Sequence, residues 1–324
     1  MPAIRPHPTG GPEQLRADDV PVPAPAAGEL RLRVAAAGVN FIDTYHRSGL
    51  YPVALPFGLG GEAAGQVTAV GAGVTDFCVG DRVVTTRAAG AYAEETLAPA
   101  AQTLKIPPGV SPATAAALLA QGLTAHALVT DCGPLRPGDT ALVHAGAGGV
   151  GRLLIQLARM RGARVLATVG SDAKVALARE AGAEEVCVYT RDDFTAAARR
   201  FTAGRGVDVA YDGVGRATFA GTLDSLRPRG VFVSYGNASG PVPPFAPLLL
   251  AQKGSLFFTR PTLNDYLRTP AELQARAGDL WGWLAAGTLQ VRIGATFPLR
   301  AAAEAHRALE SRATTGKLLL LPAG

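Results

Sequence analysis

The stretch HAGAGGVG, residues 144–151, constrains the fold of this chain more than any other part of the sequence. It follows the apolar run 141–145, which predicts a strand, and it opens a long run whose apolar spacing predicts a helix. Gly146, Gly148 and Gly151 satisfy the pattern G-x-G-x-x-G, which provides a tight turn, close approach of a pyrophosphate, and close helix–strand packing. The N-terminus of such a helix offers free N–H groups to a phosphate. The stretch therefore predicts a dinucleotide-binding site.

Apolar strands and amphipathic helices alternate on both sides of this motif. The expected strands are 141–145, 164–169, 184–189, 207–214, 230–236 and 255–260, and the expected helices are 148–162, 172–182, 194–204 and 216–226. Repeated strand–helix units with short loops require right-handed crossovers and a parallel sheet that is covered on both faces. The predicted fold class is α/β, with a doubly wound Rossmann sheet.

The segments on either side of this sheet have a different character. The first hundred residues contain short β-like runs bounded by Gly and Pro, such as 30–39, 63–74 and 81–86, and no long helix is expected there. The end of the chain is rich in predicted helix and closes with an apolar strand, KLLLLP. We therefore expect a mostly β, barrel-like domain, 1–121 with 261–324, into which the sheet domain 122–260 is inserted.

Composition excludes several classes of protein. The net charge is +5, but the arginines are scattered, with no cluster longer than Arg199-Arg200, so a nucleic-acid-binding face is not expected. No apolar run approaches the roughly 20 residues of a membrane span, and the N-terminus lacks a signal pattern. Cys78, Cys132 and Cys187 have neither disulfide nor metal-ligand spacing. We interpret them as reduced core thiols of a cytoplasmic protein.

The end of the second strand indicates which dinucleotide binds. Sites selective for NAD end this strand with an acidic residue that binds the ribose 2′-hydroxyl, whereas here the strand ends at Val169. Gly170, Ser171 and Lys174 follow, and the lysine offers a positive charge to a 2′-phosphate. Asp172 complicates the choice between NAD and NADP unless it caps the next helix and points away. The alternative interpretation of Lys174 is an ordinary solvated helix residue. We favour NADPH.

Several segments in the same order resemble one known family. The pattern of GLGGEAAGQVTAVGAGVTDFCVGDRVV (58–84) resembles the medium-chain dehydrogenases/reductases. NFIDTYHRSGLYP, HAGAGGVG, YDGVG, GNASG, KGSLFFTRP and LESRATTGK resemble its quinone oxidoreductase branch, which is zeta-crystallin-like. The resemblance implies a GroES-like, mostly β catalytic domain around the Rossmann domain, and an NADPH:quinone oxidoreductase activity.

Two positions distinguish this chain from the zinc alcohol dehydrogenases of the same superfamily. Where those enzymes have a Cys and a His that bind zinc, this sequence has Asn40 and Gly61, and the four-cysteine structural lobe is missing. Neither residue replaces a zinc ligand, so no metal site is predicted. Without a Lewis acid, the expected acceptors are conjugated carbonyls, such as quinones, that are already electrophilic. We expect Glu62 to pair with Arg312 or Lys317; the alternative is a carboxylate exposed at a turn.

The resemblance also implies roles for individual residues. The catalytic candidates are Asn40, beside the nicotinamide and its ribose, and Tyr45 and Tyr51, which either wall the pocket or donate a hydrogen bond to a substrate oxygen. Asp43 is expected to cap a helix or tether a loop. The expected cofactor contacts are Asn40, Thr124, Gly148, Gly149, Val150, Gly170, Ser171, Lys174, Tyr189, Tyr235, Gly236, Asn237, Phe258, Arg260, Arg312 and Lys317.

The resemblance further implies a homodimer, formed through the sheet edge at Ser255–Arg260. An NADPH-dependent reductase of enones or alkenals fits the same features and is the alternative enzyme. A crystallin-like or RNA-binding protein is the alternative outside enzymes, although no RNA-binding signature is present.

Overall fold

The computed structural model describes residues 1–322, which form two compact units. The first unit begins with Met1–Ala120 and includes Thr269–Ala285 and the chain from Val291 onward. The second unit contains Gln121–Arg268 and Ala286–Gln290. The segment 261–268, which the sequence analysis assigned to the first domain, therefore lies in the second unit, as does 286–290.

The second unit contains a parallel sheet of six strands in the order β10-β9-β8-β11-β12-β13. All five strand pairs in it are parallel. Its strands are β8 (Thr140–Val143), β9 (Arg164–Val169), β10 (Glu185–Val188), β11 (Val207–Asp212), β12 (Leu226–Ser234) and β13 (Phe257–Thr259). The order reverses between β8 and β11, which is the doubly wound topology that the sequence predicts.

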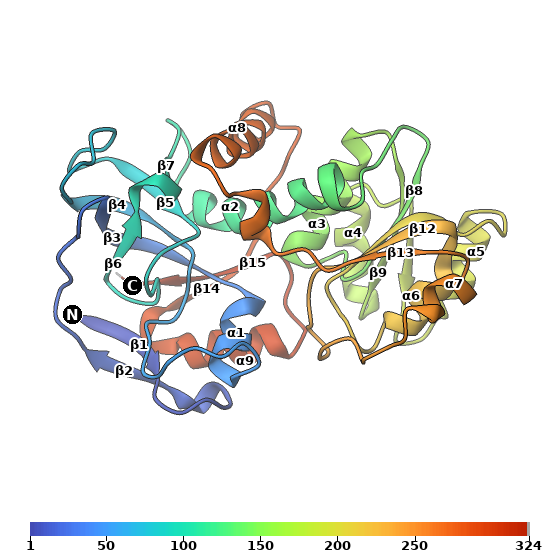
Figure 1. The fold of residues 1–324 in the computed structure, drawn as a ribbon, viewed down its shortest axis with the longest axis horizontal. Coiled ribbons are helices and arrows are strands. Elements are labelled where there is room, and N and C mark those ends of the chain that lie inside the picture. The colour runs from blue at the N-terminus through green and yellow to red at the C-terminus, as the bar shows by residue number, and fades with distance from the viewer. Residues whose placement is uncertain (323–324) are drawn as a thin grey trace. The chain divides into compact units, whose positions relative to one another are not determined.

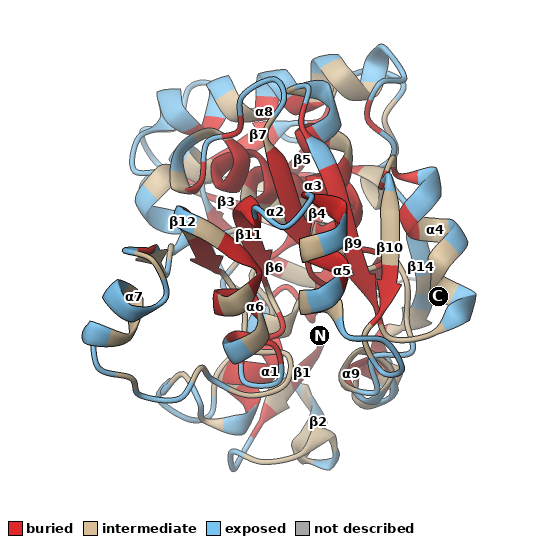
Figure 2. Ribbon diagram, turned by 90° about the vertical axis from the view of Figure 1, so that its right-hand side faces the viewer, coloured by how far each residue is buried: buried red, intermediate tan, exposed pale blue. Residues whose placement is uncertain are grey.

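Helices cover both faces of this sheet: α3 and α4 lie on one side, and α5 and α6 on the other (Figure 1). The helical elements are η3 (Leu128–Cys132), α3 (Gly149–Met160), η4 (Asp172–Lys174), α4 (Val175–Glu180), α5 (Phe194–Phe201), α6 (Phe219–Ser225), α7 (Leu248–Gln252) and η5 (Leu263–Tyr266). Because both faces are covered, the central strands β8 and β11 are buried throughout, and β9 is buried except at its first residue (Figure 2).

The first unit contains a seven-stranded sheet and a separate hairpin, β1 with β2. The sheet order is β14-β15-β3-β4-β5-β7, and β6 pairs with the first half of β3. Except for β14 with β15, the pairs are antiparallel. The strands are β1 (Pro2–Pro6), β2 (Leu15–Asp19), β3 (Glu29–Val39), β4 (Ala63–Val70), β5 (Arg82–Thr85), β6 (Glu95–Pro99), β7 (Thr103–Lys105), β14 (Ile293–Pro298) and β15 (Lys317–Leu321).

The helical elements of the first unit include a short helix, α1, to which the sequence analysis gave no residue range. They are η1 (Pro12–Gln14), α1 (Phe41–Ser48), η2 (Ala100–Gln102), α8 (Pro270–Ala285), η6 (Leu299–Ala301) and α9 (Ala302–Glu310). No long helix was expected in this part of the chain, and Asp43 was expected to cap a helix or tether a loop. Asp43 caps a helix: Asn40 and Asp43 form a capping pattern at the start of α1, and Gly49 is in the left-handed conformation at its end.

Helix α2 (Pro112–Ala127) continues into η3, and the unit boundary after Ala120 falls within it. Together they form a helix, Pro112–Cys132, that is long and apolar enough to cross a membrane. Its most apolar window is 67% buried within the protein, which is typical of a core helix rather than of a membrane span.

Candidate functional site

The glycine loop joins β8 to α3, as expected, but its glycines act differently from the prediction. The residue with positive φ at the sharp turn is Ala145, with φ 53°, and not Gly146. A Cβ on Gly146 would lie 2.8 Å from the Cβ of Ala167, so this glycine permits close packing. A Cβ on Gly151 would lie 2.2 Å from the carbonyl oxygen of Ala145. The loop therefore folds back onto the first turn of α3 because Gly151 has no side chain.

The N-terminus of α3 forms a cradle for a phosphate. Gly148 is the N-cap, and Gly149 and Val150 begin the helix. The first N–H groups of a helix have no intrahelical partner, and together with the helix dipole they favour an anion. The end of the Gln121 side chain packs against Gly149, in the space that a Cβ at this position would occupy. These residues fit the pyrophosphate of a dinucleotide.

The residues predicted for the adenosine end lie together after β9 and β10. Ser171 is the N-cap of η4, which ends at Lys174. A Cβ on Gly170 would lie 3.2 Å from the hydroxyl of Tyr189, so the phenol lies directly over this glycine. The structure thus brings Gly170, Ser171, Lys174 and Tyr189 to one edge of the sheet.

Asp172, the complication in the cofactor assignment, has a partner that sequence reasoning missed. Arg191 Nη1 donates to both of its carboxylate oxygens, at 3.0 and 3.1 Å. Arg191 also pairs with Asp192, and the two carboxylates raise the pKa of the guanidinium above its ordinary value. An arginine beside the expected 2′-phosphate position therefore balances the charge of Asp172. The signal was available: Arg191 follows the third strand by three residues.

The remaining predicted cofactor contacts in the second unit differ in their burial and in their position in the fold. Tyr235, Gly236 and Asn237 follow β12 at the carboxyl edge of the sheet, and the ring of Tyr235 packs on Gly213. Thr124 lies in α2 and is partly buried, and Arg260 is exposed just beyond β13. Phe258 is partly buried, and its ring packs in an aromatic cluster with Phe219, Phe232 and Phe245. Its contact with the cofactor stays a prediction.

His144 is structural, as its position at the end of a core strand suggested. It is fully buried, and its two ring nitrogens are each hydrogen-bonded at 2.9 Å, to the hydroxyls of Thr168 and Thr222. Burial lowers its pKa, so the ring is neutral at physiological pH.

In the first unit, all three catalytic candidates lie in helix α1 or next to it. Asn40 is its N-cap, and Tyr45 lies on its buried face. Tyr51 follows the helix, its backbone N–H donates to the carbonyl of Tyr45, and the two rings meet edge-on with centroids 5.2 Å apart. The two phenols are therefore held as a pair.

Glu62 forms the predicted pair with a C-terminal cation, and the cation is Lys317, not Arg312. Lys317 Nζ donates to Glu62 Oε2 at 2.5 Å and to Asn40 Oδ1 at 2.7 Å. Asn40 Nδ2 donates to Glu62 Oε2 at 2.9 Å, and the backbone N–H of Ala120 donates to Glu62 Oε1 at 2.7 Å. The side chains of Lys317 and Glu62 are 0% and 2% exposed. Lys317 therefore holds Asn40 rather than presenting its own charge to a ligand.

The glycine at position 38 makes room for this Asn40–Glu62–Lys317 cluster. A Cβ there would lie 2.1 Å from Glu62 Oε2 and 2.8 Å from Lys317 Nζ. This answers why a single carboxylate lies among glycines and alanines: the small residues enclose a buried ion pair.

Beside this cluster lies a second buried network, which sequence reasoning missed. Its members are Asp43, Tyr92, His306, Arg47 and Glu310. Asp43 accepts hydrogen bonds from the backbone N–H of Asn40 at 2.9 Å and from the hydroxyl of Tyr92 at 3.0 Å. Burial raises the pKa of Asp43 to about 6 and lowers that of His306 to about 3. This Asp43 network fixes the start of α1, and with it Asn40.

Within residues 1–322, no group of three or more His, Cys, Asp or Glu side chains is arranged to hold a metal ion. All three cysteines are free. Cys78 is exposed and Cys132 partly exposed, so the prediction of three core thiols holds only for Cys187, whose pKa is raised by burial to about 11.

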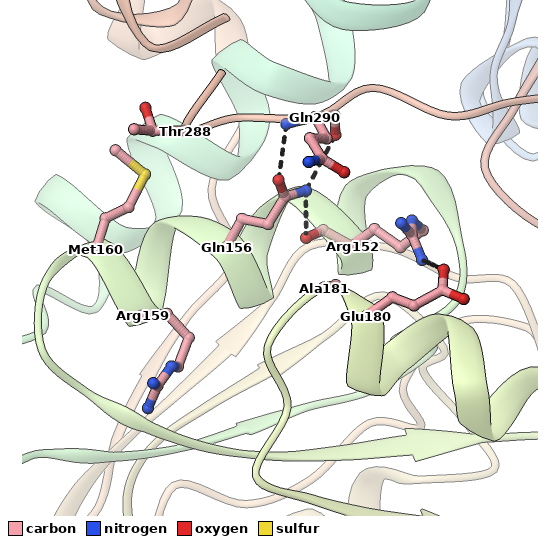
Figure 3. Close-up of a pocket in the computed structure, with 8 residues that line it drawn as sticks. All are labelled: Arg152, Gln156, Arg159, Met160, Glu180, Ala181, Thr288 and Gln290. Atoms are coloured by element: carbon pink, nitrogen blue, oxygen red, sulfur yellow. Dashed lines mark hydrogen bonds and ion pairs between the residues drawn. The ribbon is translucent and has the colours of Figure 1, made fainter. Parts of the chain in front are cut away.

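A cavity of about 220 Å³ lies elsewhere in the second unit (Figure 3). It is lined by Arg152, Gln156, Arg159, Met160, Glu180, Ala181, Thr288 and Gln290. Gln156 bridges it by accepting from the backbone N–H of Gln290 and donating to its carbonyl, at 2.7 and 3.0 Å. None of the predicted site residues lines this cavity, so it is not the candidate site.

Comparisons with known proteins cover nearly the whole chain. Residues 26–108 match the alcohol dehydrogenase GroES-like domain, and residues 181–320 match the zinc-binding dehydrogenase family. The chain is 45% identical to a quinone oxidoreductase of Pseudomonas aeruginosa, with 97% of each chain covered. It is 41% identical to a 2-haloacrylate reductase of Burkholderia, covering 98% of this chain and 97% of the relative.

The structure is also similar to solved structures. One is Escherichia coli quinone oxidoreductase complexed with NADPH, which is 42% identical, with a TM-score of 0.97 over 99% of this chain and 100% of the other.

Proposed function

The chain belongs to the zinc-free quinone oxidoreductase branch of the medium-chain dehydrogenases/reductases, and from this premise we propose that it reduces quinones with NADPH. The observation that carries the proposal is the α3 cradle in a fold that matches an NADPH-bound quinone oxidoreductase over 99% of the chain. Bound NADPH supplies the reducing equivalents.

Residues of the second unit bind and orient the cofactor in this proposal. The N–H groups at Gly149 and Val150 hold the pyrophosphate. Lys174 holds the 2′-phosphate through its positive charge, and Arg191 neutralises the nearby Asp172. Thr124, Tyr189, Tyr235, Gly236, Asn237 and Arg260 remain predicted contacts, as does Arg312 in the first unit.

The proposed reduction depends more on orienting the acceptor against the cofactor than on activating the acceptor. A quinone or an enone is electrophilic through conjugation, so its reduction needs alignment, hydrogen bonds to the developing negative oxygen, and exclusion of water. A neutral phenol is a suitable donor and a poor base. We assign Tyr45 and Tyr51 to the substrate, as wall or as donor, and Asn40 to the cofactor.

A second activity, reduction of a conjugated carbonyl compound other than a quinone, is favoured by one observation. The chain is 41% identical to a protein named 2-haloacrylate reductase. The substrate of that relative has a carbon–carbon double bond conjugated to a carboxyl group, so it belongs to the same electronic class as an enone.

The test is a panel of quinones, enones, alkenals, 2-haloacrylates and simple alcohols, each assayed with NADPH or NADP and with NADH or NAD. We expect quinone reduction with NADPH that a chelator does not change, weaker turnover with NADH, and no alcohol oxidation. Turnover of alcohols that is lost on adding chelator would contradict the proposal. Faster reduction of enones than of every quinone would select the second activity.

We further propose a cytoplasmic homodimer that binds neither nucleic acid nor membrane. Edge strand β13 supports the dimer, because Phe257 on this strand is 63% exposed. An exposed apolar side chain on an edge strand favours pairing with a second copy.

A further inference from the structure

The connection between α1 and β4 contains an exposed segment that is entirely apolar. Residues 50–57 read LYPVALPF, and no side chain among them is charged. Residues 52–56 are all exposed, and the side chains of Leu50, Val53 and Leu55 are exposed by 41%, 40% and 40%. On a protein surface, contiguous exposed apolar side chains mark a place where something binds. We call residues 50–57 the apolar loop.

The two ends of the apolar loop are fixed against helix α1. The ring centroids of Tyr51 and Phe57 lie 6.2 and 6.4 Å from that of His46. Phe57 also packs against the core of the first unit. Between these two anchors, residues 52–56 begin and end with a proline, which restricts the backbone. The loop therefore presents its apolar side chains in a fixed arrangement.

The side of α1 that meets the loop adds further uncharged surface. Burial lowers the pKa of His46, so its ring is neutral at physiological pH. Ile42 precedes His46 by one helical turn, so it lies on the same side of α1, and it is 47% exposed. The apolar surface thus continues from the loop onto the helix.

The size and the charge of this surface indicate what binds to it. A stable interface between proteins takes roughly 20–30 residues from each partner, which is several times more than the loop offers. Membrane-binding segments combine apolar side chains with exposed cations. Here Arg47, just before the loop, is buried and paired with Glu310. Arg5, which contacts the loop, pairs with Asp18. The occupant that fits is a small apolar group.

Tyr51 connects this surface to the proposed substrate site. It belongs to the apolar loop, and its ring meets that of Tyr45, the other phenol assigned to the substrate. We propose that the apolar loop binds a hydrocarbon side chain of the acceptor, so that the preferred acceptors are quinones with an alkyl or isoprenyl chain. This inference rests on the proposed function, in which the two phenols contact the substrate.

The test compares benzoquinones that differ only in the length of one chain. The headgroup is kept constant and carries a methyl, a butyl or a hexyl group, and each quinone is assayed with NADPH. We expect kcat/KM to rise about twofold for each added CH2, or about thirtyfold from methyl to hexyl, since complete burial of a CH2 gives about fourfold and a chain on an open loop is about half buried. The rise should come from KM, while kcat changes less than twofold, because the chain is bound equally in the ground state and the transition state.

A double variant, Val53→Ser with Leu55→Ser, removes the apolar side chains from the exposed part of the loop. Both side chains are exposed, so the stability of the fold should change little. The ratio of kcat/KM for the hexyl quinone to that for the methyl quinone should fall to about threefold or less, and each single variant should lower it by part of this amount. Leu55→Met, which keeps the apolar surface, should retain the wild-type ratio.

The matched control is Val22→Ser with Val79→Ser. It removes two exposed valines of the first unit that lie outside the loop, so it should show the wild-type ratio. A ratio near one for the wild-type protein, or an unchanged ratio in the loop double variant, would overturn the inference. Sedimentation with phosphatidylcholine–phosphatidylglycerol vesicles that the loop double variant loses would identify a membrane contact instead, and would overturn it as well.

The failure of the proposed function is a separate result. It would appear as wild-type protein that reduces none of the quinones with NADPH, the methyl quinone included. If the methyl quinone is reduced and the ratio is near one, only the inference about the apolar loop is wrong.

Discussion

Asp43 and His306 are linked through Tyr92 in one buried network, yet burial moves their pKa values in opposite directions. The pKa of Asp43 rises from 3.8 to about 6, because burial disfavours the carboxylate. The pKa of His306 falls from 6.5 to about 3, because burial and the neighbouring Arg47 both disfavour the imidazolium. The two groups therefore make opposite contributions to stability in acid.

The signs follow from proton linkage. Below pH 6.5 the unfolded chain takes up a proton at His306 and the folded protein does not, so stability falls as the pH falls toward 3. Between pH 6 and 3.8 the folded protein takes up a proton at Asp43 before the unfolded chain does, so stability rises as the pH falls. Each contribution has a slope of about 1.4 kcal/mol per pH unit, and between pH 4 and 6 they nearly cancel.

We predict that Asp43→Asn exposes the His306 contribution. Relative to wild type, the free energy of unfolding of this variant should fall by about 1 kcal/mol more for each pH unit between 6 and 4. Urea denaturation at several pH values measures this difference. His306→Gln should show the opposite change in slope. Parallel pH profiles for the three proteins would mean that the two groups do not titrate as described.

At the scale of elements, the close contact between the glycine loop and the first turn of α3 predicts the effect of a substitution at Gly151. Gly151→Ala would place a Cβ 2.2 Å from the backbone oxygen of Ala145, and backbone cannot turn aside as a side chain can. We expect a loss of about 2 kcal/mol or more in the free energy of unfolding, and at least tenfold weaker NADPH binding, since the loop must shift. Thermal unfolding and calorimetric titration measure the two effects.

A second helical glycine provides the matched control. Gly278 lies in α8, and a Cβ there meets no atom within 4 Å. Gly278→Ala should therefore stabilise the protein by about 0.5–1 kcal/mol through helix propensity and leave NADPH binding unchanged. Equal effects of the two substitutions would show that crowding against Ala145 is not the cause.

The elements differ in how far they were predictable. The buried parallel strands were found because both faces pack, so each strand is a short apolar run between turns; β9 occupies the predicted residues 164–169. The bounds of helix α1 were not predicted because it has only eight residues, although Asp43 was expected to cap a helix or tether a loop. Phe258 was expected to contact the cofactor because its segment resembles the family, and that contact stays a prediction; the aromatic cluster around its ring was not predictable, because only the fold assembles it.

For the whole molecule, the proposed dimer gives the clearest prediction. Phe257 in β13 is 63% exposed, and Leu248 in α7 is 64% exposed. Phe257→Glu places a charge on the edge that we propose is covered, so this variant should be a monomer at micromolar concentration by light scattering. Val79→Glu alters a residue in the first unit that is equally exposed, and it should remain a dimer. A wild-type monomer would refute the proposal.

Partners that are far apart in sequence mark the limit of prediction from one chain. A cation near the C-terminus was expected for Glu62, but the choice between Arg312 and Lys317 depends on the register of β15 against β3. Asp43 and His306 belong to one network only because α9 packs there, which no local pattern shows. The cofactor cradle was predictable because it lies within one short stretch, and the catalytic candidates came from the resemblance.

The buried pairing of Glu62 with Lys317 restricts how this protein can be altered. Replacing Asn40 by the cysteine of a zinc enzyme would remove one of the two acceptors of Lys317 and one donor to Glu62 in one step. Positions 38, 40, 62 and 317 are therefore expected to change together or not at all, so single-site libraries would miss the routes to a metal-dependent alcohol dehydrogenase. Such a conversion would need combinations of substitutions at these four positions together with Gly61, where the zinc enzymes have a histidine.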